Sequence, residues 1–290
     1  MKIDLHVHSK SSDGRFAAAE ILLEAKKMNI AFISITDHDN ISCQHDAARL
    51  AKEAGIRYLT GVELNVTFSH PRYREGKPIS LDFLGYQFDA NNSALEKKIE
   101  LMAQHREERA VKILQNLNLE FSKESIQCLT LQDFAEIEAS VDGVLGRPHI
   151  ADYLVKKRIV ATRQEAFDKY LVKCDVPKYP LHLQEASKLV RDAGGKLVLA
   201  HPNDPNGTSL VALTKGLAEQ TKIVEETMLP FIDGVECWHS RSDAQTTHHY
   251  VAFAEKHNLL RTGGSDCHQK PLLMGTVPIP SYVADQFQIL

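Results

Sequence analysis

Histidines and carboxylates gather in short clusters along this chain, at spacings that suit metal ligands. His6 and His8 are separated by one residue, which places both imidazoles on one face of an extended segment. Asp266 and His268 repeat this spacing near the other end of the chain. Neutral imidazole and carboxylate suit borderline divalent ions such as Zn²⁺, Mn²⁺ and Fe²⁺, so the pattern predicts a site for such ions. The remaining candidates are Asp13, Asp37, His38, Asp39, Glu63, His201, Glu236 and His239.

Seven short apolar or alternating segments position these residues. Residues 3–7 alternate in polarity, and 31–36 form an apolar run, so both are predicted to be strands. Amphipathic stretches at 16–28 and 42–54 follow them and predict helices. Strands that alternate with helices indicate βαβ units and a parallel sheet, which is an α/β fold. The other strands are expected at 57–62, 80–87, 196–200, 234–238 and 259–265, and the later helices at 210–228 and 243–257.

A long helical stretch interrupts this alternation. Strand signals are weak between Ser93 and Asp192, where helices are expected at 95–117, 140–160, 164–171 and 183–192. The chain is therefore expected to form one α/β part from residues 1–92 and 193–290. Residues 93–192 are expected to form a helical insertion that covers the site.

The candidate ligands fall at the C-terminal ends of the predicted strands. His6 and His8 close the first strand, His38 follows the second, and Glu63 ends the third. In α/β barrels the active site lies at the C-terminal ends of the strands. Each motif alone is equally consistent with a polar strand end or a helix cap. Their joint occurrence after six strands favours an active site with metal ions.

Composition excludes several classes of protein. The net charge of −4 over 290 residues argues against a protein that coats nucleic acid nonspecifically. The five cysteines include no CxxC pair, which argues against a disulfide framework and favours a reducing cytosol. No signal peptide and no apolar run long enough for a membrane span are evident. A cytoplasmic protein is expected, and no feature predicts a membrane or a protein partner.

At this point the chain resembles the PHP family, the polymerase and histidinol phosphatase domain. The matching motifs stand in family order and span nearly the whole chain. They are residues 4–8 (DLHVH), 36–39 (TDHD), 61–63 (GVE), 200–202 (AHP) and 264–268 (GSDCH). The resemblance implies a distorted seven-stranded βα barrel, similar to a TIM barrel, with a trinuclear metal site.

The resemblance also implies ligand roles. His6, His8, Glu63 and Asp266 would hold one divalent ion. Glu63 would bridge to a second ion that His201 shares. Asp13, His38 and His268 would hold the third ion.

One position departs from the family pattern. In residues 81–85 (LDFLG), Asp82 stands where the family usually carries a histidine. Asp82 would ligate the second ion through a harder oxygen donor. The alternative is His70, which lies beside Pro71 in an expected loop. The match in strand register favours Asp82. The sequence after His201, residues 203–207 (NDPNG), also departs from the usual basic continuation.

Three further residues are candidates for substrate binding or catalysis. Arg147 is a candidate phosphate clamp, because a guanidinium pairs with phosphate bidentately. A salt bridge at the start of a helix explains Arg147 equally well. His149 contacts substrate or packs within the lobe. His239 is a candidate proton donor because it follows a predicted strand.

A metal-dependent phosphoesterase is the function that the sequence favours. The 146–151 motif (GRPHIA) is similar to the stand-alone branch of the family. That likeness implies nucleoside 3′,5′-bisphosphates, or the 5′ ends of short oligonucleotides, as substrates, cleaved by attack of a metal-activated hydroxide on phosphorus. The alternatives are a histidinol-phosphate phosphatase, an amidohydrolase and a non-catalytic metal-binding barrel. No predicted strand ends in a lysine of the kind that amidohydrolases recruit.

Overall fold

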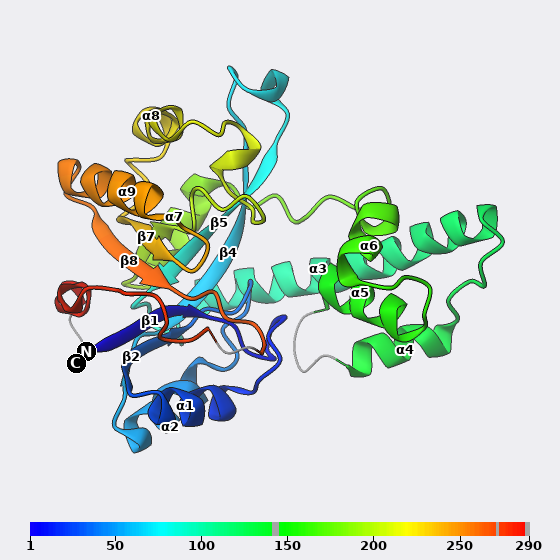
Figure 1. Ribbon diagram of the computed structural model, residues 1–290, viewed down its shortest axis with the longest axis horizontal. Coiled ribbons are helices and arrows are strands. Elements are labelled where there is room, and N and C mark those ends of the chain that lie inside the picture. Colours follow the sequence, from blue (N-terminus) through cyan, green and yellow to red (C-terminus); the bar gives the residue numbers. More distant parts are fainter. Residues whose placement is uncertain (141–144, 271–272, 288–290) are drawn as a thin grey trace.

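Two β-sheets and a helical lobe make up the computed structural model (Figure 1). It describes residues 1–140, 145–270 and 273–287. The first sheet has three parallel strands in the order β1–β2–β3. Helix α1 connects β1 to β2, and α2 connects β2 to β3, as expected for βαβ units. These elements are β1 Lys2–Val7, α1 Ala18–Lys27, β2 Ile30–Ile35, α2 Gln44–Ala54 and β3 Arg57–Tyr58.

The second sheet is mixed. Its strand order is β4–β5–β6–β7–β8, with β6, β7 and β8 parallel to one another. Strand β5 runs antiparallel to both β4 and β6. The ten residues 69–78 join β4 to β5 as a hairpin, whereas a parallel pair needs a crossover connection. The expectation of a parallel sheet throughout is therefore wrong for β5. The strands are β4 Gly61–Phe68, β5 Ile79–Tyr86, β6 Lys196–Leu199, β7 Gly234–His239 and β8 Leu260–Gly264.

Two isolated bridges link the sheets. Val7 pairs with Cys267 in parallel, and His38 pairs with Glu63 in parallel. Both bridges lie at the C-terminal ends of strands β1 and β2. The sheet topology gives a mixed α/β fold and does not confirm a single seven-stranded βα barrel.

Helices cover the outer face of the second sheet. Helix α7 packs on β4 and β6, and α9 packs on β7 and β8. Their apolar faces join one continuous core, in which Phe83, Leu84 and Tyr86 are fully buried. The covering helices are α7 Leu183–Asp192, α8 Leu217–Thr227 and α9 Ala244–Lys256.

One long helix connects the sheets to the lobe. Helix α3, Ser93–Lys123, buries Leu95 and Ile99 in the main core. Its second half buries Leu117 and Phe121 in a separate core with the other lobe helices. Figure 1 shows the lobe beside the sheets, joined to them by α3 and a returning segment. The lobe helices are α4 Leu131–Ala139, α5 Arg147–Lys156, α6 Arg163–Ala166 and a π-helical turn at Phe167–Leu171.

Several predicted boundaries change in the structure. The third predicted strand, 57–62, breaks after Tyr58, and β4 continues to Phe68. Glu63 therefore lies inside a strand and not at its end. The helix expected at 140–160 includes residues 141–144, which lie outside the described residues, and its described part begins at Arg147. The division at 92 and 193 stays a prediction. Among the described helices, none is long and apolar enough to span a membrane.

Candidate active site

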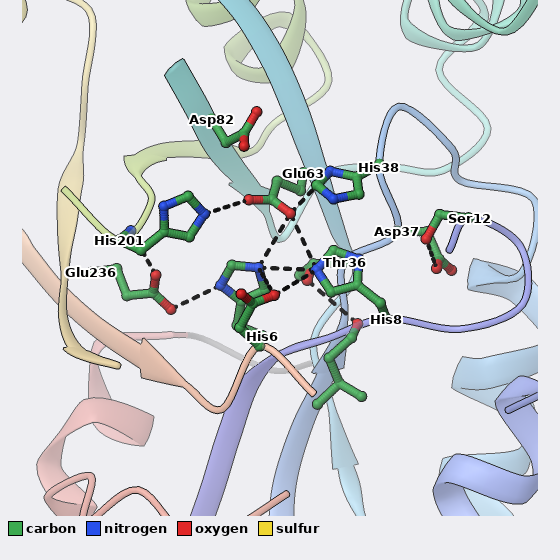
Figure 2. A network of polar contacts seen from close by, with 12 residues as sticks. His6, His8, Ser12, Thr36, Asp37, His38, Glu63, Asp82, His201 and Glu236 are labelled. Atoms are coloured by element: carbon green, nitrogen blue, oxygen red, sulfur yellow. Dashed lines mark hydrogen bonds and ion pairs between the residues drawn. The ribbon is translucent and has the colours of Figure 1, made fainter. Parts of the chain in front are cut away.

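Glu63 lies at the centre of a cluster of histidines (Figure 2). Its Oε1 atom is 3.0 Å from Nε2 of His201. Its Oε2 atom is 3.1 Å from Nδ1 of His38, 3.2 Å from Nε2 of His8 and 3.3 Å from Nε2 of His6. The Glu63 side chain is 1% exposed. One carboxylate thus reaches imidazoles from three separate segments of the chain.

Asp266 completes a second group with the two histidines of β1. Its Oδ1 atom is 3.2 Å from Nε2 of His8 and 3.5 Å from Nε2 of His6. The two Nε2 atoms are themselves 3.1 Å apart. Asp266 adopts a positive φ of 54°, which turns the chain immediately after β8. This turn aims the carboxylate back at β1.

A third group forms around the carboxylate of Asp13. Nε2 of His268 is 3.1 Å from Oδ1 of Asp13, and Nε2 of His38 is 4.0 Å from Oδ2 of Asp13. His8 Nδ1 is 4.0 Å from Oδ1 of Asp13. The structure therefore brings His8, Asp13, His38 and His268 close enough to share one ion. His8 faces both this group and the group around Asp266.

The donor set fits divalent metal ions. Zn²⁺ and similar ions bind nitrogen and oxygen ligands at about 2.0–2.2 Å, so neighbouring ligands of one ion lie about 3 Å apart. The spacings around Glu63 and Asp266 match this value. The buried Nδ1 atoms of His8 and His201 make no hydrogen bond to any described residue. Unpaired buried imidazole nitrogens close to carboxylates are expected where a cation is to bind.

The carboxylates raise the pKa of His8 and His201. Burial alone lowers the pKa of His8, but hydrogen bonds with Asp266 and Glu63 outweigh it and raise the pKa to about 10. Burial also lowers the pKa of His201, and Glu63 raises it to about 9. Without ions the imidazoles of His8 and His201 therefore hold protons at neutral pH. Metal binding must displace these protons.

Asp82, not His70, lies with the cluster. Asp82 comes from β5 and can share an ion with Glu63 and His38. Its side chain accepts a hydrogen bond from the Asn65 amide on the paired strand β4. His70 instead packs edge-on against Tyr73, with ring centroids 5.0 Å apart. Strand register thus places the carboxylate of Asp82 on the same face of the sheet as Glu63 (Figure 2).

Asp37 positions the loop that carries Asp13. Its carboxylate accepts hydrogen bonds from the Ser9 backbone at 2.7 Å and from the Ser9 and Ser12 hydroxyls at 2.6 Å each. Asp37 is fully buried. Its oxygens are occupied by the loop, so the TDHD motif supplies a candidate ligand in His38 and a support for the loop in Asp37.

A cavity of about 520 Å³ opens in front of the donor cluster. Asp13, His38, Glu63, Asp82 and His201 form its floor. Its lining also carries cationic side chains from the lobe, the returning segment and the loop after β7, which form a cationic wall. These are Arg106, Arg109, Arg147, Lys178 and Arg241.

Aspartates hold the arginines of the cationic wall. Arg147 pairs with Asp175 at 2.7 Å, and Arg109 pairs with the same carboxylate. Arg106 pairs with Asp39. A guanidinium held by one carboxylate keeps further N–H donors for an anionic ligand. The wall is therefore suited to phosphate oxygens.

Arg147 borders the cavity, whereas the described cavity lining does not include His149 or His239. Nδ1 of His149 accepts a hydrogen bond from the Gly146 backbone at 3.0 Å, at the start of α5. His239 is buried, and its Nε2 atom lies 3.5 Å from Oδ2 of Asp266. Both histidines are close to the site without facing its open space.

Arg241 and Lys178 are site residues that sequence reasoning missed. Arg241 donates from Nε to Asp204 at 2.7 Å and from Nη2 to Asp266 at 2.6 Å. Arg241 follows His239 by two residues, so its position just after a predicted strand could have indicated that it belongs to the site. Lys178 lies in the segment that returns from the lobe, where no pattern indicated function. Burial lowers the pKa of Lys178, and the nearby Asp82 carboxylate opposes this shift.

Comparison with known proteins places this chain in a family. The PHP domain family model matches residues 4–175. The chain belongs to the PHP domain family. A 5′-3′ exoribonuclease of Haemophilus influenzae is 31% identical over 208 residues, which cover 69% of each chain. A 3′,5′-nucleoside bisphosphate phosphatase of Chromobacterium violaceum is 27% identical and covers 92% of this chain and 87% of its own.

Two solved structures share the fold over nearly the whole chain. A predicted metal-dependent phosphoesterase from Bifidobacterium adolescentis superposes with a TM-score of 0.80 at 26% identity, covering 98% of this chain and 94% of its own. An amidohydrolase from Chromobacterium violaceum, with bound sulfate and no metal, superposes with a TM-score of 0.79 at 25% identity. The match covers 98% of this chain and 93% of the amidohydrolase chain. Family membership, the phosphoesterase relatives and the donor cluster together identify the chain as a phosphoester hydrolase of the PHP family.

Proposed function

We propose that this PHP protein hydrolyses phosphate esters of nucleotides, either nucleoside 3′,5′-bisphosphates or the 5′ ends of short oligonucleotides. One observation carries the proposal: five cationic side chains and a cluster of metal-ligand residues line the same cavity of about 520 Å³. A nucleotide fits such a volume, since ligand pockets typically span roughly 300–1,000 Å³. The names of the exoribonuclease and bisphosphate phosphatase relatives support the same substrate class.

We propose three divalent ions, with Mn²⁺, Zn²⁺ and Fe²⁺ as candidates. His6, His8, Glu63 and Asp266 would hold one ion. Glu63, Asp82 and His201 would hold the second ion, and Asp13, His38 and His268 the third. Bound ions of this kind polarise phosphate oxygens and lower the pKa of water.

The cationic wall would bind and orient the substrate. Arg241 is fixed between Asp204 and Asp266, which places its guanidinium at the edge of the donor cluster. Arg147 and Lys178 lie farther along the wall and suit a second phosphate. A group held at both ends is confined to the geometry that in-line displacement requires.

His149 and His239 are proposed to act indirectly. His239 would steady Asp266 through the contact of 3.5 Å between its Nε2 atom and Oδ2 of Asp266. His149 would fix the start of α5 and hence the Arg147 side chain.

The lobe is proposed to cover the cavity mouth. It would correspond to residues 93–192 inserted between the two parts of the α/β body. Arg106 and Arg109 reach the cavity from α3, and Arg147 from the start of α5. The proposal that both sheets form one distorted βα barrel rests on the bridges Val7–Cys267 and His38–Glu63.

An amidohydrolase is the second candidate. The likeness to the Chromobacterium amidohydrolase structure favours it, as does a lysine in the cavity. However, Lys178 lies outside the strands, in the segment between the lobe and α7. Sulfate bound to that relative is a tetrahedral anion with the shape of phosphate, which supports the phosphoesterase instead.

The hydrolysis products, inorganic phosphate from a monoester or a mononucleotide from an oligonucleotide, decide between the candidates. Purified protein reconstituted with Mn²⁺ would be assayed with adenosine 3′,5′-bisphosphate, a 5′-phosphorylated oligonucleotide and histidinol phosphate. Turnover of the bisphosphate or the oligonucleotide, abolished by His8→Ala and Asp266→Ala, is the expected result. Faster turnover of histidinol phosphate than of the other two substrates would refute the proposal. Absence of turnover of all three substrates, with bound metal confirmed, would also refute it.

A further inference from the structure

A second cavity of about 510 Å³ adjoins the one in front of the donor cluster. The two cavities share four lining residues, Arg147, Lys178, Gly207 and Thr208. A ligand bound at the donor cluster therefore has a direct path past Arg147 and Lys178. The path leads away from the metal-ligand residues, because the described lining of the second cavity includes no histidine and no candidate ligand.

Besides Arg147 of α5, three segments that lie far apart in the sequence form its walls. The β4–β5 connection and the start of β5 contribute Arg74, Ile79 and Ser80. The segment that returns from the lobe, residues 175–178, forms the second wall, and the loop after β6 forms the third. In Figure 1 the β4–β5 connection projects beyond the body of the sheet. The outer end of the path is thus defined by an extension of the hairpin.

Cations outnumber carboxylates along this path, since Asp175 is the one carboxylate among the described lining residues and pairs with Arg147 at 2.7 Å. Arg147 and Lys178 stand at its inner end and Arg74 at its outer end. Arg74 is exposed, and its guanidinium makes no ion pair or hydrogen bond with a described residue. The same connection also carries Arg72, which pairs with Glu226 and does not line the described cavity. Of these two arginines, Arg74 is therefore the one available to a ligand in the cavity.

The remaining lining indicates what part of a ligand is recognised. Ser80 and Thr208 offer hydroxyl groups, and Ile79, Val176 and Pro177 are aliphatic. No aromatic side chain appears among the described lining residues. Proteins that grip bases of single strands stack them on aromatic rings, whereas phosphates are met by cations. This lining suits a sugar-phosphate backbone and does not discriminate between bases.

We infer that the second cavity binds the sugar-phosphate backbone of the nucleotides that follow the scissile phosphate of a single-stranded substrate. The inference rests on the proposed nucleotide phosphoesterase function and extends it with a binding site that phosphorylated oligonucleotides use and nucleoside bisphosphates do not. Arg74 contacts a backbone phosphate beyond the first cavity. A nucleoside bisphosphate, which fills the first cavity alone, does not reach Arg74.

Charge variants of Arg74 test the inference. Binding is measured by fluorescence anisotropy with a 5′-phosphorylated hexanucleotide that carries phosphorothioate linkages and a 3′ fluorophore. Arg74→Glu reverses the charge and is expected to weaken binding several-fold. Arg74→Gln only removes the charge and is expected to weaken binding less. The matched control is Arg72→Gln on the same connection, which is expected to bind as the wild type does. Because Arg74→Gln removes one cation from the phosphate backbone, the slope of log K against log salt is expected to become shallower by about 0.7.

Turnover of adenosine 3′,5′-bisphosphate separates the inference from the proposed function. The Arg74 variants are expected to keep the wild-type kcat and KM for the bisphosphate. Ser80→Trp, which fills the second cavity, is expected to weaken oligonucleotide binding and to spare the bisphosphate. Equal oligonucleotide binding by the wild type, Arg74→Glu and Ser80→Trp would overturn the inference. Absence of all turnover, with hexanucleotide binding still dependent on Arg74, would refute the proposed function and leave the binding site standing.

Discussion

Glu236 holds His6 in the orientation that the metal-ligand cluster needs. Oε1 of Glu236 lies 3.0 Å from Nδ1 of His6, and both side chains are fully buried. The other carboxylate oxygen, Oε2, accepts the His201 backbone N–H at 2.8 Å. Glu236 therefore fixes one histidine through its ring and a second through its main chain. Such carboxylate–histidine pairs settle the tautomer, so that Nε2 of His6 is left free to bind an ion.

Replacing Glu236 is predicted to weaken metal binding more than it disturbs the fold. Loss of a supporting carboxylate typically lowers metal affinity by about 10–100-fold. Glu236→Ala is expected to show a loss of this size by isothermal titration with Mn²⁺, and Glu236→Gln a smaller one because an acceptor oxygen remains. Glu226→Gln, on α8 away from the cluster, serves as the control. Unchanged affinity in Glu236→Ala would show that the pair has no role in metal binding.

Asp82 is predicted to bias its ion site towards Mn²⁺. Oxygen ligands suit Mn²⁺, whereas imidazole favours Zn²⁺ more strongly. Asp82→His is expected to lower the ratio of Mn²⁺ to Zn²⁺ retained after dialysis against an equimolar mixture, measured by elemental analysis. Asp89→His, at an exposed position shortly after the same strand, is expected to keep the wild-type ratio. An identical ratio in Asp82→His would show that Asp82 is not a ligand.

The sequence predicted the site better than the fold, for physical reasons. Most candidate ligands lie in short motifs at or just after strand ends, and local spacing was sufficient to select His6, His8 and His38, which the structure brings together around Glu63. Strand β5 was expected at 80–87, but its antiparallel direction escaped prediction because alternation of polarity is the same in parallel and antiparallel strands. Lys178 and Arg74 were not predicted as site residues. Their positions beside the cavities arise from long-range packing of the returning segment and of the β4–β5 hairpin. No local pattern records such packing.

Metal uptake is predicted to release protons and to weaken in acid. In the metal-free protein His8, with a pKa of about 10, and His201, with a pKa of about 9, hold their protons at neutral pH. Ligation needs neutral imidazoles, so affinity is expected to rise with pH up to that range. Calorimetric titration with Mn²⁺ in buffers of different ionisation enthalpy measures the protons released. Heats that do not depend on the buffer would contradict the prediction.

The metal-free protein is predicted to lose stability as the pH rises above neutrality. The folded-state pKa values of His8 and His201 are raised above the unfolded value of about 6.5. Their contribution is therefore fully present below a pH of about 6.5 and is lost as the pH rises through about 9 and 10. Urea unfolding in chelator, at a series of pH values from slightly acidic to alkaline, measures the trend. His8→Gln is expected to show a smaller change of the free energy of unfolding with pH. A wild-type free energy of unfolding that is constant over this pH range would refute the prediction.

Gly264 is predicted to be irreplaceable, because β1 passes directly over it. A Cβ atom at this position would lie 2.2 Å from Cβ of His6 and 2.4 Å from its backbone nitrogen. The backbone of β1, which pairs with β2 and bridges to Cys267 after β8, cannot move aside as a flexible side chain would. Overpacking of this kind typically destabilises a protein by about 1–3 kcal/mol. Gly264→Ala is thus expected to lower the melting temperature and to reduce bound metal, since His6 must shift with its strand. Gly216→Ala, where the nearest atom is 3.8 Å away, is the control. Metal content and melting temperature equal to the wild type in Gly264→Ala would show that the two strands are not in this close register.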